Sequence, residues 1–248
     1  MEIKFTSTKK DKPDKLRIGI CAPSGYGKTY LLRTIPYQKE AEVLVITSEK
    51  GNTVLRDKNY QEYALEQNNI YKELFNVLKH LYTDESKQFK WVCLDSMTDI
   101  AEKFLAHMQK NPDPYKTKTG AIDTRAMYGD LKKQIIRIMD GFLGIPYGHK
   151  ICIFGAIEEN EGVDRKLKLN MPGSAKDVIM FNFDEFYHIK IQQDEEKGTV
   201  RQLVTCNDGY YEAKSRMSAV SPLEVYEECD LTHIISKCYW EKEKENDQ

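Results

Sequence analysis

Short apolar runs alternate with segments of helical periodicity along most of the chain. Strands are predicted where apolar, β-forming residues are continuous, at residues 16–22, 43–47, 91–95 and 150–156. Helices are predicted where apolar residues recur every three or four positions, at residues 28–35, 60–82, 97–109 and 125–143. Strands that alternate with helices are typical of an α/β fold with a mainly parallel central sheet.

The C-terminal third shows a different pattern. Residues 183–191 and 200–205 flank a polar turn, which predicts an antiparallel hairpin added to the sheet. Residues 111–120 contain two prolines and a glycine and are predicted to be a loop. Residues 157–176 are polar, and we expect a mobile loop there.

The two ends are polar and charged. We divide the chain into an N-terminal arm at residues 1–15, one domain at residues 16–238 and a charged tail at residues 239–248. No run of about 18 apolar residues occurs, and the N-terminus lacks the apolar core of a signal peptide. We therefore expect a cytoplasmic protein with no membrane partner.

Charge and cysteine content narrow the class further. The 248 residues include 37 Lys and Arg against 39 Asp and Glu, a formal net charge of −2. This balance excludes a globally basic DNA-binding protein but leaves room for a local basic groove. The six cysteines form no CxxC pair, so we interpret them as reduced thiols and not as a disulfide or zinc framework.

The most specific motif follows the first predicted strand. It fits the phosphate-loop pattern except that alanine replaces the first glycine, and with the next residue it comprises Ala22, Pro23, Ser24, Gly25, Tyr26, Gly27, Lys28, Thr29 and Tyr30. Glycines let backbone N–H groups surround phosphate oxygens, and the helix that follows adds its dipole. We expect Lys28 to reach the β- and γ-phosphates of ATP and Thr29 to bind Mg²⁺.

Two carboxylates end predicted strands. Asp95 closes the run at residues 91–95 and is expected to hold Mg²⁺, with Ser96 as the cap of the next helix; the alternative is that Asp95 is itself the cap. Glu49 follows residues 43–47 and is a candidate to orient or deprotonate the attacking water. From spacing alone, a surface pair with Lys50 is an equal alternative.

Together these segments resemble the RecA-like ATPase core, and within it a group of small phage-encoded nucleotide-binding proteins that anneal single strands. The resemblance spans residues 16–216 and includes Glu49-Lys50-Gly51, the Asp95-Ser96 strand end, and Arg125 with Tyr128-Gly129. It implies that Glu49 is catalytic beside Lys28. The strand at 150–156 lacks the glutamine that this family carries at its end, so coupling between the ATP state and DNA is expected either to be weaker or to be carried by another residue such as Glu158.

The resemblance also implies partners. Single-stranded DNA would contact the loop at 157–176 through Arg165, Lys166 and Lys168, with Lys116, Lys118 and Arg125 as the other candidate surface. Sites of this family lie between subunits, so a homo-oligomer, ring or filament, is implied, and a single-strand-binding protein is a further candidate partner. Arg216 is a candidate arginine finger, with a surface salt bridge as the alternative.

These predictions favour a magnesium-dependent ATPase that is slow and is stimulated by DNA. It would act on single strands in phage recombination, annealing or repair within the host cytoplasm. A motor or packaging accessory built on the same core is the alternative. A small-molecule kinase is a weaker one, because no lid with paired arginines follows the core.

Overall fold

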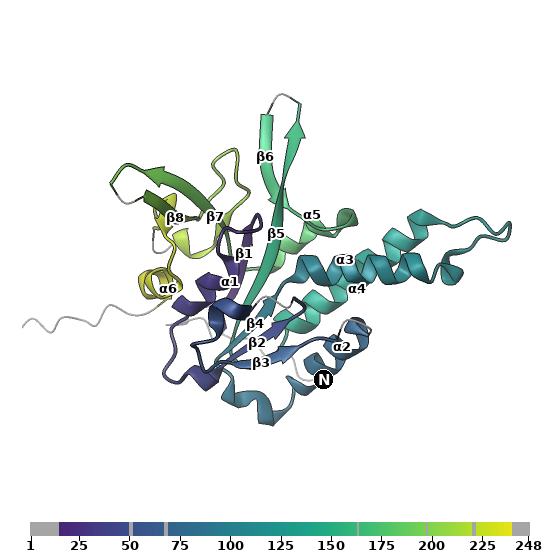
Figure 1. Ribbon diagram of the computed structural model, residues 1–248, viewed down its shortest axis with the longest axis horizontal. Helices are drawn as coiled ribbons and strands as arrows, with labels where there is room; N and C mark the ends of the chain where they lie inside the picture. The colour runs from purple at the N-terminus through teal and green to yellow at the C-terminus, as the bar shows by residue number, and fades with distance from the viewer. Residues whose placement is uncertain are drawn as a thin grey trace, which may run out of the picture.

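The computed structural model describes residues 15–49, 52–66, 69–162, 164–196, 198–219 and 222–239, and within them ten strands form one sheet (Figure 1). The main path of the sheet has the order β10-β8-β7-β1-β5-β4-β2-β3, while β6 pairs with β5 and β9 with β7. The strands are β1 (Arg17–Ala22), β2 (Val43–Thr47), β3 (Gln61–Ala64), β4 (Trp91–Asp95), β5 (His149–Glu161), β6 (Asp164–Leu169), β7 (Glu185–Asp194), β8 (Gly198–Val204), β9 (Lys214–Ser215) and β10 (Tyr226–Glu228).

The centre of the sheet is parallel. Strands β7, β1, β5, β4, β2 and β3 all pair in parallel, whereas β8 pairs antiparallel with β7 and with β10. The predicted α/β class, with a C-terminal antiparallel hairpin, is therefore confirmed. In a parallel arrangement the carboxyl ends of β1, β2 and β4 meet at one edge, which places the phosphate loop, Glu49 and Asp95 together.

Two hydrophobic cores lie on opposite faces of the sheet, because successive side chains of a strand point to opposite sides. In β2, Leu44 and Ile46 enter one core and Val43 and Val45 the other. The first core lies under α2 (Ile70–His80), α3 (Met97–Lys110) and α4 (Thr124–Leu143), and the second under α1 (Lys28–Leu31) and α6 (Leu231–Tyr239).

Two expectations about local structure were wrong. Residues 61–64 form edge strand β3 and not the start of a helix; all four are exposed, so no apolar alternation marks them. Residues 157–176 are not a mobile loop: they continue β5, turn back as β6 and reach α5 (Lys176–Ile179). This β5–β6 hairpin extends beyond the rest of the sheet (Figure 1), so most of its side chains are polar.

Solvent exposure along β6 explains why its sequence resembles that of a loop. Among the β6 residues whose burial the structure describes, Leu167 and Leu169 are buried, at 4% and 3% relative exposure, and Lys168 lies between them. No described helix combines the length and the hydropathy that crossing a bilayer requires.

Candidate active site

The phosphate loop connects the carboxyl end of β1 to α1. Gly25 and Gly27 adopt φ angles of 81° and 92°, a left-handed backbone that favours glycine over residues with a side chain. The Leu31 N–H donates to the Gly27 carbonyl at 2.9 Å and begins the helix. The glycines thus give the loop the turn through which backbone N–H groups can face a phosphate.

Lys28 is held at the loop itself. Its Nζ donates to the carbonyls of Ala22 and Pro23, both at 2.9 Å. Burial lowers the pKa of Lys28, and the nearby Cys21, Asp95 and Glu49 act in the opposite direction. The ammonium is therefore positioned beside the carboxylates of the site, where a phosphate can replace the two carbonyls as its partner.

Thr29 and Asp95 bring two oxygens together. Thr29 Oγ1 donates to Asp95 Oδ2 at 2.6 Å. Burial raises the pKa of Asp95 to about 6, although this hydrogen bond lowers it. A hydroxyl and a carboxylate at this spacing suit Mg²⁺, which prefers oxygen ligands and takes few from the protein. Within the described residues no group of three or more His, Cys, Asp or Glu could hold a metal. Phosphate and water would supply the other ligands.

Glu49 lies across the same edge of the sheet. Ser96 Oγ donates to Glu49 Oε1 at 2.8 Å, and the Glu49 N–H donates to Thr47 Oγ1 at 3.2 Å. Ser96 also accepts from the Asp99 N–H at 3.3 Å, so the predicted helix cap is confirmed. The carboxylate of Glu49 is thereby fixed at the end of β2 but remains exposed to solvent.

These residues surround one cleft of about 590 Å³. Its lining includes the predicted Ser24, Gly25, Gly27, Lys28, Thr29, Tyr30, Glu49 and Asp95. Sequence reasoning missed other residues that line it, namely Val54, Thr98, Asp99, Glu102, Gly155, Ala156 and Asn170. The first turns of α3, the helix after Asp95, carry Thr98, Asp99 and Glu102. Their closeness in sequence to that strand end could have indicated that they line the cleft.

The base of the β5–β6 hairpin is bonded to this cleft. Thr98 Oγ1 accepts from the Gly155 N–H and donates to the Asn170 carbonyl, both at 2.8 Å. The Asn170 N–H donates to the Gly155 carbonyl at 2.8 Å. A displacement of α3 at Thr98 would therefore reach both strands of the hairpin.

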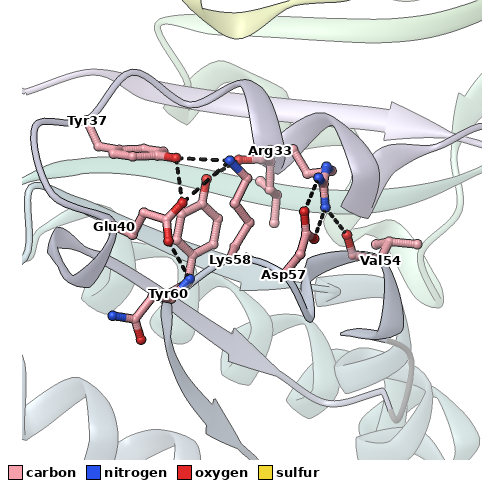
Figure 2. A network of polar contacts seen from close by, with 9 residues as sticks. Arg33, Tyr37, Glu40, Val54, Asp57, Lys58 and Tyr60 are labelled. Carbon is pink, nitrogen blue, oxygen red and sulfur yellow. Dashed lines mark hydrogen bonds and ion pairs between the residues drawn. The ribbon is translucent and has the colours of Figure 1, made fainter.

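A surface network ties the segment that follows Glu49 to the segment that follows the phosphate loop (Figure 2). Arg33 bonds the carboxylate of Asp57 and donates to the Val54 carbonyl. Further along, Lys58 donates to Tyr37 at 3.0 Å, and Tyr37 donates to Glu40 at 2.9 Å. Val54, which lines the cleft, is thus fixed relative to α1.

The remaining phosphate-loop residues lie around the cleft. Ala22 is buried at the end of β1, and Pro23 supplies a carbonyl to Lys28. The Tyr26 ring packs partly against the core under α1 and α6, while its carbonyl accepts from Arg201 Nε at 3.2 Å. Arg201 belongs to β8; it contacts the phosphate loop but is not among the residues that line the cleft.

The predicted DNA-contacting cations lie on β6, away from the cleft lining, and each has an interaction. Arg165 is 3.8 Å from Glu158, and Lys168 is 3.6 Å from Glu212. Lys166 also interacts with another residue. Arg216 pairs with Asp184 at 2.8 Å, in the surface salt bridge that we gave as the alternative to an arginine finger.

Comparison with known proteins identifies the family of this chain. The sequence profile of the family described as "AAA domain" matches residues 14–217, which is most of the chain. The chain belongs to this AAA domain family. This membership supports a P-loop ATPase. A comparison with curated proteins finds no match.

Two solved structures resemble this AAA domain protein. One is an ATPase from the type III secretion system of pathogenic bacteria, with 17% identity and a TM-score of 0.47 over 82% of this chain and 57% of that one. The other is the RadB recombinase, with 13% identity and a TM-score of 0.40 over 80% of this chain and 84% of that one. This chain thus spans little more than half the length of the secretion ATPase.

Proposed function

We propose that this AAA domain protein hydrolyses ATP with Mg²⁺ and acts on single-stranded DNA in phage recombination, strand annealing or repair. One observation carries the proposal: a cleft that contains Lys28, Thr29, Asp95 and Glu49 is hydrogen-bonded at Thr98 to a projecting, cation-bearing hairpin. The same structure thus joins an ATP site to a candidate DNA site.

Each residue of the cleft has a role in this proposal. Lys28 exchanges its two carbonyl partners for the β- and γ-phosphates. Thr29 and Asp95 would hold Mg²⁺, whose positive charge would offset that of the phosphates. Glu49, oriented by Ser96, accepts a hydrogen bond from the attacking water and takes its proton.

DNA would bind along the hairpin through its backbone phosphates. Arg165, Lys166 and Lys168 supply the cations, and a phosphate would compete with the carboxylates that they now contact. Such contacts carry little sequence information, so the affinity is expected to be similar for unlike sequences. Thr98 would then transmit the state of the nucleotide to the hairpin.

Assembly is part of the proposal. We infer a homo-oligomer, ring or filament, in the host cytoplasm, with a single-strand-binding protein as a candidate partner. Arg216 would act as an arginine finger only if it left Asp184 and reached a neighbouring subunit.

The test is an ATPase assay with Mg²⁺, with and without single-stranded DNA, alongside direct DNA binding. Turnover that rises with single strands and not with duplex DNA supports the proposal; Lys28→Ala is the inactive control. ATP turnover without DNA binding or stimulation would indicate a motor or packaging accessory. Turnover that requires a small-molecule acceptor would indicate a kinase.

A further inference from the structure

Arg201 is an arginine that the chain itself places against its own phosphate loop. Its Nε donates to the Tyr26 carbonyl at 3.2 Å, although 175 positions separate the two residues. A Cβ on Gly27 would lie 3.3 Å from Nε and 3.6 Å from the Cδ of Arg201. The base of the guanidinium is therefore in near contact with the loop that surrounds the phosphates.

The charge of Arg201 is not neutralised by an ion pair in the part of the chain that the structure describes. Arg33, Arg165 and Arg216 each lie within 4 Å of a carboxylate, whereas no described carboxylate lies that close to Arg201. Arg201 is also exposed at the surface. A hydrogen bond through Nε leaves the two terminal nitrogens of the guanidinium available to an anion.

The order of the strands shows from which side Arg201 approaches. Strand β8 is separated from β1 by β7, whereas Glu49 and Asp95 end β2 and β4 on the other side of β1. The guanidinium therefore meets the loop on the side opposite the carboxylates that serve hydrolysis.

We propose that Arg201 binds the diphosphate part of the bound nucleotide in cis, as a second cation beside Lys28. This inference rests on ATP binding in the cleft, and it assigns to β8 a role within the same subunit. The role differs from that of a finger contributed by a neighbour, because it strengthens ADP and ATP binding alike. It also fits the glycine at position 27, where a side chain would crowd the guanidinium.

The test measures equilibrium binding of a fluorescent ADP and ATP, together with steady-state turnover. Arg201→Gln keeps an N–H donor but removes the charge, and we expect it to bind both nucleotides roughly tenfold to hundredfold more weakly. KM should rise while kcat changes little, and the salt dependence of binding should become shallower. Arg201→Lys, which keeps the charge, should recover much of the affinity.

Lys190→Gln is the matched control. Lys190 lies on β7, which pairs antiparallel with β8, and its Nζ is 3.9 Å from the centroid of the Tyr226 ring. This variant should bind nucleotide as the wild type does. The inference is overturned if Arg201→Gln binds ADP within twofold of the wild type, or if it lowers kcat alone. A wild type that binds no nucleotide would instead contradict the proposed ATPase function.

Discussion

At the scale of single residues, the active site depends on side chains that serve two neighbours at once. Ser96 caps α3 through the Asp99 N–H and also donates to Glu49. Thr98 joins Gly155 to Asn170. The pattern around Asp95 predicted the cap but not the second contact, because the partner of Ser96 lies 47 positions away.

Glu49→Gln tests the role of the carboxylate. The amide is nearly isosteric and can still accept from Ser96, but it cannot take a proton from water. We expect ATP binding to be retained and turnover to fall about 100-fold or more. Binding of a fluorescent ATP and steady-state release of phosphate measure the two quantities.

Glu85→Gln is the control for Glu49→Gln, since Glu85 is exposed and lies outside the cleft lining. Its turnover should remain close to that of the wild type. Loss of nucleotide binding in Glu49→Gln, or unchanged turnover, would show that Glu49 does not activate the water.

His149 makes stability depend on pH. Its Nδ1 accepts from the Leu16 N–H at 3.0 Å, and burial lowers its pKa to about 4. The unfolded chain binds a proton near pH 6.5 but the folded protein does not, so the free energy of unfolding decreases as the pH falls from 6.5 to 4. By pH 5 the loss amounts to about 2 kcal/mol.

His149→Gln should therefore lose about 2 kcal/mol less stability than the wild type between pH 7.5 and pH 5. Urea unfolding of the wild type and the variant at the two pH values measures this difference. The substitution also alters packing against Trp91, but it does so at both pH values, so this effect cancels. His80→Gln alters an exposed imidazole and is the control. Equal pH dependence in His149→Gln and the wild type would refute the argument.

At the scale of elements, the β5–β6 hairpin differs most from what its sequence suggests. Six residue pairs, from Ala156–Leu169 to Glu161–Asp164, join its strands. Backbone pairing makes it a strand pair, and the alternating apolar pattern by which strands are recognised is confined to residues 166–169 of β6. Arg165 and Lys168 face carboxylates, so the DNA binding proposed there would be an exchange of partners.

Replacement of Arg165, Lys166 and Lys168 by glutamine tests the hairpin as a DNA site. We expect weaker binding of single strands and a salt dependence that flattens by up to about 0.7 per lost phosphate contact. ATP binding should persist, because the phosphate loop lies elsewhere. Fluorescence anisotropy with a labelled oligonucleotide, at several salt concentrations, measures both effects.

The comparison variant replaces Lys116, Lys118 and Arg125 instead. If it loses affinity and the hairpin variant does not, the segment between α3 and α4 is the DNA surface. If neither changes binding, phosphate contact through these cations is excluded.

At the scale of the whole molecule, the N-terminal arm is the segment that we connect with assembly into an oligomer. The N-terminal arm contains Ile3 and Phe5, and these residues lie outside the described part of the chain. The same is true of the end of the charged tail. The arm either lies against a neighbouring subunit as an added strand or packs on its own domain.

Deletion of residues 1–12 separates the two arrangements. If the arm joins subunits, the mass measured by light scattering should fall to that of a smaller assembly, because the deletion removes Ile3 and Phe5. Thermal unfolding controls for damage to the domain. An unchanged mass would remove the arm from the interface.

The sequence by itself determined the α/β class, the phosphate loop and the strand ends that carry Glu49 and Asp95. Each is encoded locally, by a buried apolar run followed at once by a polar group, and parallel strands bring their carboxyl ends to one edge of the sheet. Burial of Cys21, Cys93 and Cys152 within such runs was predictable for the same reason.

Only the tertiary structure decided the contacts that cross the sheet. Strand β3 forms through backbone pairing with β2, and no side-chain periodicity records that pairing. Arg201 reaches Tyr26 because β7 pairs with β1 and carries β8 beside the loop. Such proximity arises from the order of strands in the sheet, and local sequence patterns do not specify that order.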